Sequence, residues 1–264
     1  MTAEPSPTTL SVTAPTALVT GAAARIGRAI ALELAGAGWA VAVHYHRSED
    51  AARSVVAEIE AAGGRAASVR ADLSDEAAVA ALVPEAAAAL GPVGALVNNA
   101  SVFENDRIES LTRENWDEHM AVNLRAPAVL TQAMAAALPD GASGAIVNIV
   151  DQRVLNLTPY FQSYTISKAA LWTLTQTTAL ALAPRIRVNA IGPGPVLPSP
   201  RQTPQQFDEQ VAKVPLKRRT TPEDVARTVR YILSMESMTG QLIILDGGQH
   251  LGWAQPGQAE PPVE

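Results

Sequence analysis

The sequence reads Thr16-Ala-Leu-Val-Thr-Gly-Ala-Ala-Ala-Arg-Ile-Gly-Arg-Ala-Ile-Ala-Leu-Glu-Leu-Ala-Gly36 near its beginning. Residues 16–20 form a short apolar run typical of a buried strand, and residues 28–36 have helical periodicity. Between them, Gly21 and Gly27 allow the backbone to approach a pyrophosphate group at the N-terminus of the helix. This order of strand, turn and helix predicts a dinucleotide-binding fold.

The rest of the chain repeats the alternation of strand and helix. Further strands are predicted at 40–44, 67–71, 94–98, 145–150, 187–191 and 241–245. Helices are predicted at 51–63, 74–90, 112–138 and 221–233, and a further helix contains Tyr164 and Lys168 and runs to about residue 182. Such alternation predicts a parallel sheet with right-handed crossovers. We therefore expect an α/β protein with a single Rossmann-type, doubly wound domain, whose seven-stranded parallel sheet has helices on both faces.

The predicted domain spans residues 15–252. Residues 1–14 and 253–264 are rich in Pro and polar residues, and we expect them to be a flexible leader and a flexible tail. Residues 196–218 mix Pro, Gln and charge without a clear period, which predicts a mobile loop over a substrate site.

Composition excludes several classes of function. The net charge of −6 argues against a nucleic-acid or anionic-membrane surface. The absence of cysteine excludes disulfides, thiolate metal sites and a cysteine nucleophile, and we expect no bound metal. No signal peptide is visible and no uncharged apolar stretch reaches about 18 residues. We expect a cytoplasmic protein with a small-molecule substrate.

The second strand is followed by residues suited to a phosphorylated ribose. An NAD site usually has a carboxylate at this point, whereas this chain has Tyr45, His46, Arg47 and Ser48. Arg47 can pair with a 2′-phosphate and Ser48 can donate a hydrogen bond to it, which favours NADP(H). Alternatively, Arg47 is an ordinary surface arginine.

Other strand ends complete the expected cofactor site. Asp72 can hold the adenine amino group, or it can cap the helix that follows. The cofactor site is expected to comprise Gly21, Arg25, Ile26, Gly27, Tyr45, His46, Arg47, Ser48, Asp72, Leu73, Asn99, Ala100, Lys168, Pro193 and Gly194.

Tyr164 and Lys168 are four residues apart, which places both on one face of a helix. A nearby ammonium group favours the phenolate and lowers the pKa of a tyrosine. The pair is therefore a candidate proton donor. The alternative is that it belongs to a solvated helix face.

Together these motifs resemble those of the short-chain dehydrogenase/reductase family over residues 15–250. The matching residues are Thr20-Gly21…Gly27, Asn98-Asn99-Ala100, Asn123, Tyr164-x-x-x-Lys168, Pro193-Gly194 and Asp246-Gly247-Gly248. The resemblance implies an NAD(P)-dependent enzyme, commonly a homotetramer. It also implies that Tyr164 is the general acid, that Lys168 lowers its pKa and binds the nicotinamide ribose, and that Asn123 helps to relay protons.

Two residues depart from the family pattern. Arg25 replaces the middle glycine of the turn, and Asp151 stands where the catalytic serine is expected. A carboxylate repels the alkoxide that develops when a ketone is reduced, but it assists protonation of the nitrogen of a C=N bond. The alternative is that Asp151 marks an inactive reductase.

Both departures occur in the pteridine reductases, and the chain resembles that subgroup. The matching stretches are Gly-Ala-Ala-Ala-Arg25-Ile-Gly, His44-Tyr-His-Arg-Ser48, Asn-Asn-Ala-Ser101-Val-Phe103 and Lys213-Val-Pro-Leu216. By this resemblance Phe103 stacks on the pterin ring, while Ser101 and Arg25 contact the pterin or the cofactor phosphates. Alternatively, Phe103 is packed in the core.

The expected function is NADPH-dependent reduction of a pterin or folate C=N bond. The expected catalytic residues are Asp151, Tyr164, Lys168 and Asn123, and the expected substrate-binding residues are Arg25, Ser101, Phe103, Asp151 and Tyr164. Two alternatives remain open. One is an NADP-dependent reductase of another imine or carbonyl, and the other is a catalytically silent NADP-binding regulatory protein.

Overall fold

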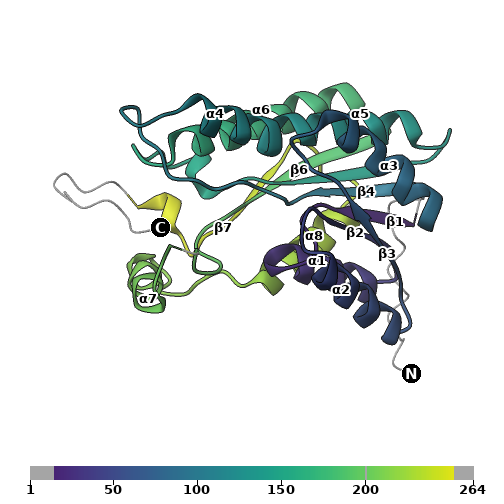
Figure 1. The fold of residues 1–264 in the computed structure, drawn as a ribbon, viewed down its shortest axis with the longest axis horizontal. Helices are drawn as coiled ribbons and strands as arrows, with labels where there is room; N and C mark the ends of the chain where they lie inside the picture. Colours follow the sequence, from purple (N-terminus) through teal and green to yellow (C-terminus); the bar gives the residue numbers. More distant parts are fainter. Residues whose placement is uncertain (1–14, 200, 253–264) are drawn as a thin grey trace.

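A single parallel sheet organises the chain. The structure, a computed structural model, describes residues 15–199 and 201–252, so the predicted leader and tail lie outside the described residues. Seven strands lie in the order β3-β2-β1-β4-β5-β6-β7, and all neighbouring strands are parallel (Figure 1). The predicted fold class is thus confirmed.

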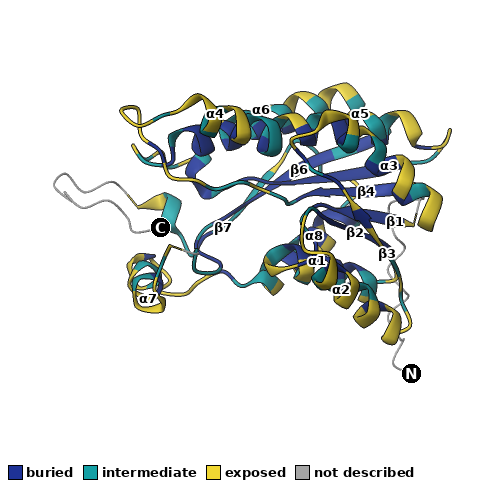
Figure 2. Cartoon of the chain, in the orientation of Figure 1, coloured by how far each residue is buried: buried dark blue, intermediate teal, exposed yellow. Residues whose placement is uncertain are grey.

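The strands lie close to their predicted positions. Their bounds are β1 (Thr16–Val19), β2 (Ala40–Tyr45), β3 (Arg65–Arg70), β4 (Val93–Asn98), β5 (Gly144–Ile149), β6 (Ile186–Pro193) and β7 (Leu242–Leu245). Every residue of β1, β2, β4 and β5 is buried, which is why these strands read as nearly continuous apolar runs (Figure 2).

Helices cover both faces of the sheet. One face carries α1 (Arg25–Gly36), α2 (Glu49–Ala61) and α8 (Pro222–Ser234); the other carries α3 (Glu76–Leu90), α4 (Arg113–Met120), α5 (Ala126–Ala137) and α6 (Gln162–Leu182) (Figure 1). A separate hydrophobic core lies under each layer. In the described ranges, no helix is long and apolar enough to cross a membrane.

The helix predicted over 112–138 contains a wide turn. A π-helical segment, η1 (Ala121–Arg125), joins α4 to α5, and Ala126 donates its N–H to the Ala121 carbonyl oxygen. Pro127, which has no amide proton, follows directly. The wide turn carries Asn123, whose side chain is fully buried.

Residues 196–218 contain a helix that the sequence analysis missed. α7 (Pro204–Lys213) begins with a capping box between Thr203 and Gln206. Phe207 is the buried residue of α7, so the apolar period is too weak to read from the sequence. The prediction of a loop throughout residues 196–218 is therefore wrong for Pro204–Lys213, while the mobility of the segment stays a prediction. α7 stands apart from both helical layers (Figure 1).

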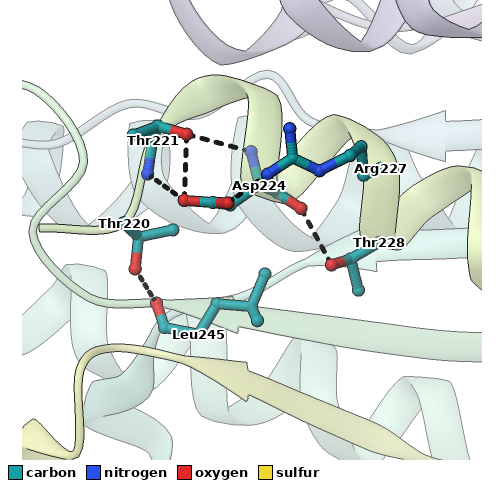
Figure 3. A network of polar contacts seen from close by, with 6 residues as sticks. All are labelled: Thr220, Thr221, Asp224, Arg227, Thr228 and Leu245. Atoms are coloured by element: carbon teal, nitrogen blue, oxygen red, sulfur yellow. Dashed lines mark hydrogen bonds and ion pairs between the residues drawn. The ribbon is translucent and has the colours of Figure 1, made fainter.

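The start of α8 is tied to the last strand. Thr221 and Asp224 form a second capping box, and Arg227 pairs with Asp224 (Figure 3). Thr220 donates a hydrogen bond from Oγ1 to the Leu245 carbonyl oxygen of β7. These contacts fix the C-terminal end of the segment that contains α7.

Candidate active site

The turn after β1 has a conformation that explains its sequence. Gly21 has φ +63°, and a Cβ on Gly27 would lie 2.1 Å from the Gly21 carbonyl oxygen. Arg25 also has a positive φ, 53°, in the region that favours glycine. This conformation explains why a glycine is usual at the position of Arg25, and it shows that the arginine occupies it at some cost in strain.

Side chains from neighbouring strands hold this turn. The Thr20 hydroxyl oxygen accepts hydrogen bonds from the backbone N–H groups of Asn99 (2.9 Å) and Ala100 (3.0 Å). The Asn99 side chain donates from Nδ2 to the Thr20 carbonyl oxygen (2.9 Å). Asn99 and Ala100 therefore meet the turn where the sequence analysis expected a cofactor contact.

A buried histidine supports the same turn from β2. His44 Nδ1 accepts a hydrogen bond from the Gly21 backbone N–H (3.0 Å), and His44 is 2% exposed. Burial lowers the pKa of His44 from 6.5 to about 4, so the imidazole is neutral at pH 7 and Nδ1 can accept. His44 is absent from the site predicted from the sequence, although a histidine within an apolar strand is a visible signal.

A cavity of about 520 Å³ lies on the β2 side of the turn. It is lined by Gly21, Ser101 and the predicted cofactor-binding residues Tyr45, His46, Arg47, Ser48, Asp72 and Leu73. Tyr45 is buried, His46 is half-buried, and Arg47 and Ser48 are exposed. A basic residue at an open rim beside a glycine turn fits the phosphorylated end of NADP(H).

Asp72 does not cap α3. Its carboxylate accepts hydrogen bonds from the Ser74 hydroxyl (2.7 Å) and backbone N–H (2.9 Å), and these bonds lower its pKa. Asp75 is the capping residue instead and accepts from Ala77 and Ala78. The capping alternative for Asp72 is therefore wrong.

A second cavity, of about 220 Å³, lies beyond the ends of β4, β5 and β6. Its walls contain Arg25, Ile26, Asn99, Ser101, Phe103, Asp151, Tyr164, Lys168, Pro193 and Gly194, all of which the sequence analysis assigned to cofactor or substrate. Ser101 lines both cavities. Within the described residues, no cluster of three or more His, Asp or Glu side chains could hold a metal ion.

Tyr164 and Asp151 are in direct contact in this cavity. The Tyr164 hydroxyl donates to Asp151 Oδ2 (2.8 Å), while Asp151 Oδ1 accepts from the Arg153 backbone N–H (2.8 Å). Burial and the adjacent carboxylate raise the pKa of Tyr164 well above its usual 10. The expectation that this pKa is lowered is therefore wrong for the protein as the structure describes it. The phenol keeps its proton at neutral pH.

Lys168 is hydrogen-bonded to the end of β5. Its Nζ donates to the Ile149 carbonyl oxygen (2.8 Å) and lies 5.8 Å from the centroid of the Tyr164 ring. Lys168 is 2% exposed, and burial lowers its pKa from 10.5 to about 8. The solvated-face alternative for this pair is wrong, because both side chains are buried.

Asn123 joins three elements around the site. Its Oδ1 accepts from the Val102 backbone N–H (2.8 Å) and the Ser101 hydroxyl (3.2 Å). Its Nδ2 donates to the Val102 carbonyl oxygen (3.0 Å) and to Ser167 Oγ (3.1 Å). The π-helical turn thus fixes the segment that leads into Phe103, and proton relay by Asn123 stays a prediction.

Phe103 belongs to an aromatic group. Its ring stacks on Phe161, with 4.5 Å between centroids and 2° between planes, and contacts Tyr164 edge-on at 4.6 Å. The Arg153 guanidinium lies 4.8 Å from the Phe161 centroid. Phe103 is half-buried and lines the cavity, so it is not an ordinary core residue.

Two arginines connect the site to the segment before α7. Arg25 Nη2 donates to the carbonyl oxygens of Leu197 (3.4 Å) and Pro198 (3.1 Å). Arg201 donates to the Phe103 carbonyl oxygen (2.7 Å) and pairs with Glu104 (2.8 Å). The segment therefore closes one side of the second cavity.

Several residues of this cavity escaped the sequence analysis. They are Gln152 and Arg153, which follow Asp151, Phe207 and Gln210 of α7, and Gln249, which follows Asp246-Gly247-Gly248. Nothing in their spacing could have identified them, because the long-range packing of the loops brings them together.

Comparisons with known proteins agree with this geometry. The family model described as enoyl-(acyl carrier protein) reductase matches residues 21–250. The crystal structure of FolM alternative dihydrofolate reductase 1 from Brucella suis in complex with NADP is 51% identical, has a TM-score of 0.89, and aligns over 91% of this chain and 97% of that chain.

Two further relatives match over similar lengths. The FolM alternative dihydrofolate reductase 1 from Brucella canis, complexed with NADP, is 49% identical with a TM-score of 0.87 over 93% of this chain and 98% of that chain. The 3-oxoacyl-[acyl-carrier-protein] reductase FabG of Staphylococcus epidermidis is 34% identical over 89% of this chain and 98% of its own length.

Proposed function

The chain belongs to the short-chain dehydrogenase/reductase family, and we propose that it uses NADPH to reduce the C=N bond of a dihydropterin or dihydrofolate. The coarser description is an NADP-dependent oxidoreductase with a small-molecule substrate.

NADP(H) is the cofactor, and the residues around the glycine turn fit it. The tight contact between Gly21 and Gly27 leaves no room for a side chain on Gly27, which lets the turn approach a pyrophosphate. Arg47 and Ser48 at the rim of the larger cavity supply a cation and a hydroxyl for a 2′-phosphate. When bound, NADPH supplies a hydride to the carbon of the substrate double bond.

The observation that carries the proposal is the hydrogen bond between Tyr164 and Asp151. Reduction of a C=N bond requires a proton at nitrogen as the carbon gains hydride. Tyr164 holds a proton at Oη up to high pH and can donate it to the substrate nitrogen. The Asp151 carboxylate, which accepts the Tyr164 hydrogen bond, takes up a proton from solvent and relays it to the Tyr164 oxygen after Tyr164 has donated its own. For a ketone, by contrast, the Asp151 carboxylate would repel the alkoxide forming beside Tyr164.

Similarity supports the same substrate class. Both FolM structures described above are dihydrofolate reductases by name and are about half identical to this chain. We extend the proposal to a homotetramer, as the family resemblance implies, and to the cytoplasmic location expected from the sequence.

A second candidate function is reduction of a carbonyl group. The FabG relative favours it, since that protein is named as a 3-oxoacyl-carrier-protein reductase. Asp151 argues against it. The third alternative, a silent NADP-binding regulator, is disfavoured because Tyr164 and Lys168 line one cavity.

The test is NADPH oxidation by the purified full-length protein. The substrates are dihydrobiopterin, dihydromonapterin and dihydrofolate, with acetoacetyl-coenzyme A as the carbonyl comparator. We expect turnover of at least one pterin or folate and little turnover of the ketone. Turnover of the ketone alone would support the second candidate, and no NADPH oxidation by protein that binds NADPH would support the third.

A further inference from the structure

The first turn of α6, which carries Tyr164, has no capping side chain at the residue before it. That residue is Phe161, whose backbone is left-handed (φ 55°, ψ 49°) and whose side chain contains no hydrogen-bond acceptor. The N–H groups at the start of a helix have no intrahelical partner, so another group must accept from them. Tyr164 is the third residue of α6, and fraying of this turn would move its hydroxyl away from Asp151.

Asp106, in the loop between β4 and α4, supplies the missing cap. Its Oδ1 accepts a hydrogen bond from the Ser163 N–H (3.1 Å), and its Oδ2 accepts from the Ser163 hydroxyl. Its backbone carbonyl oxygen accepts from the Gln162 N–H (3.4 Å). The helix dipole also favours a carboxylate at this end of a helix. A residue 57 positions earlier than Ser163 thus caps the helix of the proton donor.

His119 of α4 supports this cap from the other side. Its Nε2 accepts from the Glu104 N–H (3.1 Å), so Nδ1 carries the proton. Nδ1 lies 2.8 Å from both the Asn115 carbonyl oxygen and Ser163 Oγ and donates to them. The Ser163 hydroxyl keeps its own hydrogen for Asp106, where a carboxylate can only accept. Asp106 is 1% exposed, and His119 and Ser163 are fully buried.

The substrate-facing Phe103 has anchors of its own. Asn123 binds the backbone of the residue before it, and Arg201 donates to its carbonyl oxygen (2.7 Å). The turn that carries Tyr164, in contrast, relies on Asp106 for two of its N–H groups. Loss of the Asp106 side chain should therefore affect proton donation more than binding of the substrate ring.

We propose that Asp106 is a positioning residue for proton donation, because it caps α6 and so holds the Tyr164 hydroxyl beside Asp151. Asp106 acts through Tyr164 and is not among the residues that line the cavity. This inference rests on the proposed function only for the role of Tyr164 as proton donor, which the carbonyl alternative shares. Its effect should appear in kcat rather than in KM.

The experiment compares wild-type protein with Asp106→Leu and Asp106→Asn. Leucine has a similar volume and no acceptor, whereas asparagine keeps an oxygen for the Ser163 N–H. Activity is expressed per NADPH-binding site, determined by titration, so that unfolded protein does not count. We expect kcat to fall about 10- to 100-fold in Asp106→Leu and clearly less in Asp106→Asn. KM for the accepted substrate and the Kd for NADPH should change less than about threefold.

The control is Asp75→Ala, which removes the cap of α3 outside both cavities. We expect it to lower the Tm and to keep the wild-type kcat per site. Hydrogen exchange reports the cap directly. The amides of residues 162–168 should exchange faster in Asp106→Leu than in wild type, and at the wild-type rate in Asp75→Ala.

An unchanged kcat per site in Asp106→Leu would overturn the inference and leave the proposed function standing. A fall in kcat without faster exchange, or an equal fall in Asp106→Asn, would also overturn it. If Asp106→Leu does not bind NADPH, Ser163→Ala replaces it. This variant keeps the backbone N–H and loses the hydroxyl, and kcat should fall about 3- to 30-fold; an unchanged kcat overturns the inference.

The proposed function fails separately. If wild-type protein reduces only the ketone, the substrate class is wrong, and the same variants are compared with the ketone as substrate. If wild-type protein binds NADPH but oxidises it with none of the substrates, both the proposed function and the role of Asp106 are overturned.

Discussion

Tyr164 donates a hydrogen bond to Asp151, with 2.8 Å between Oη and Oδ2. The proton donor is thus paired with a carboxylate, whereas the lysine one turn away is bonded to the Ile149 carbonyl oxygen. This pairing keeps the phenol protonated at neutral pH, the form that a reduction requires.

Replacement of Asp151 by serine tests the proton path. We expect Asp151→Ser to lower kcat for the accepted dihydropterin by about 100-fold or more, because the group beside Tyr164 can no longer pass on a proton. The Kd for NADPH, measured by fluorescence titration, should not change. Asp140→Ser, in the exposed turn after α5, is the control. Unchanged turnover would place Asp151 outside the proton path.

Replacement of Arg47 tests the choice of cofactor. Loss of its pairing with the 2′-phosphate should weaken NADPH binding about 10- to 100-fold and leave NADH binding nearly unchanged. The measurement is the Kd of both cofactors for Arg47→Ala. Arg53→Ala, an exposed arginine of α2, serves as the matched control. An unaltered preference for NADPH would refute the role of Arg47.

The pKa of Lys168 predicts that activity decreases at alkaline pH. With a value of about 8, the ammonium form decreases as the pH rises through 8, while Tyr164 stays protonated. We expect kcat/KM for NADPH, which reports ionisations of the free protein, to fall above about pH 8. A flat profile to pH 10 would contradict this assignment. Lys213→Met, at an exposed position of α7, should keep the wild-type profile.

The lowered pKa of Lys168 also affects stability, but in the opposite direction: stability should rise with pH where kcat/KM should fall. Between about pH 8 and 10.5 the unfolded chain binds the proton of Lys168 and the folded protein does not. The contribution of Lys168 to the free energy of unfolding therefore rises with pH in this window, by about 3 kcal/mol in total. Comparison of thermal unfolding of wild type and Lys168→Met across the window measures it.

His44 predicts sensitivity to acid. Its pKa is lowered from 6.5 to about 4, so the unfolded chain binds more protons than the folded protein between these values. Stability should fall by about 3 kcal/mol as the pH drops from 6.5 to 4. His44→Gln keeps a hydrogen-bond acceptor for Gly21 and cannot titrate, so its unfolding free energy should depend less on pH. A slope in His44→Gln equal to that of wild type would contradict the assignment.

The sheet could be predicted because its central strands are buried on both faces. Continuous apolar runs such as β4 and β5 are typical of parallel strands covered on both faces by helices. The turns that lead from strand to helix mark the edge of the sheet at which ligands bind. α7 could not be predicted, because it packs through Phe207 and its remaining residues face water or the cavity.

The candidate site was predictable where short spacings define it. Tyr164 and Lys168 are neighbours on a helix, so their proximity follows from the sequence. The direction of the Tyr164 pKa does not, because it depends on burial and on which charged atom comes nearest. The stacking of Phe103 on Phe161 and the capping of α6 by Asp106 likewise arise from the packing of distant segments.

The π-helical turn at Ala121–Arg125 constrains how this protein can change its length. Deleting one residue there would restore regular α-helical hydrogen bonding, but it would also rotate α5 by about 100° relative to α4. Met134 and Leu130, now buried against the sheet, would swing toward solvent, and Asn123 would leave its partners. The packing of α4 and α5 thus maintains the wide turn. A one-residue deletion in the turn should be tolerated only if the apolar face of α5 is redesigned as well.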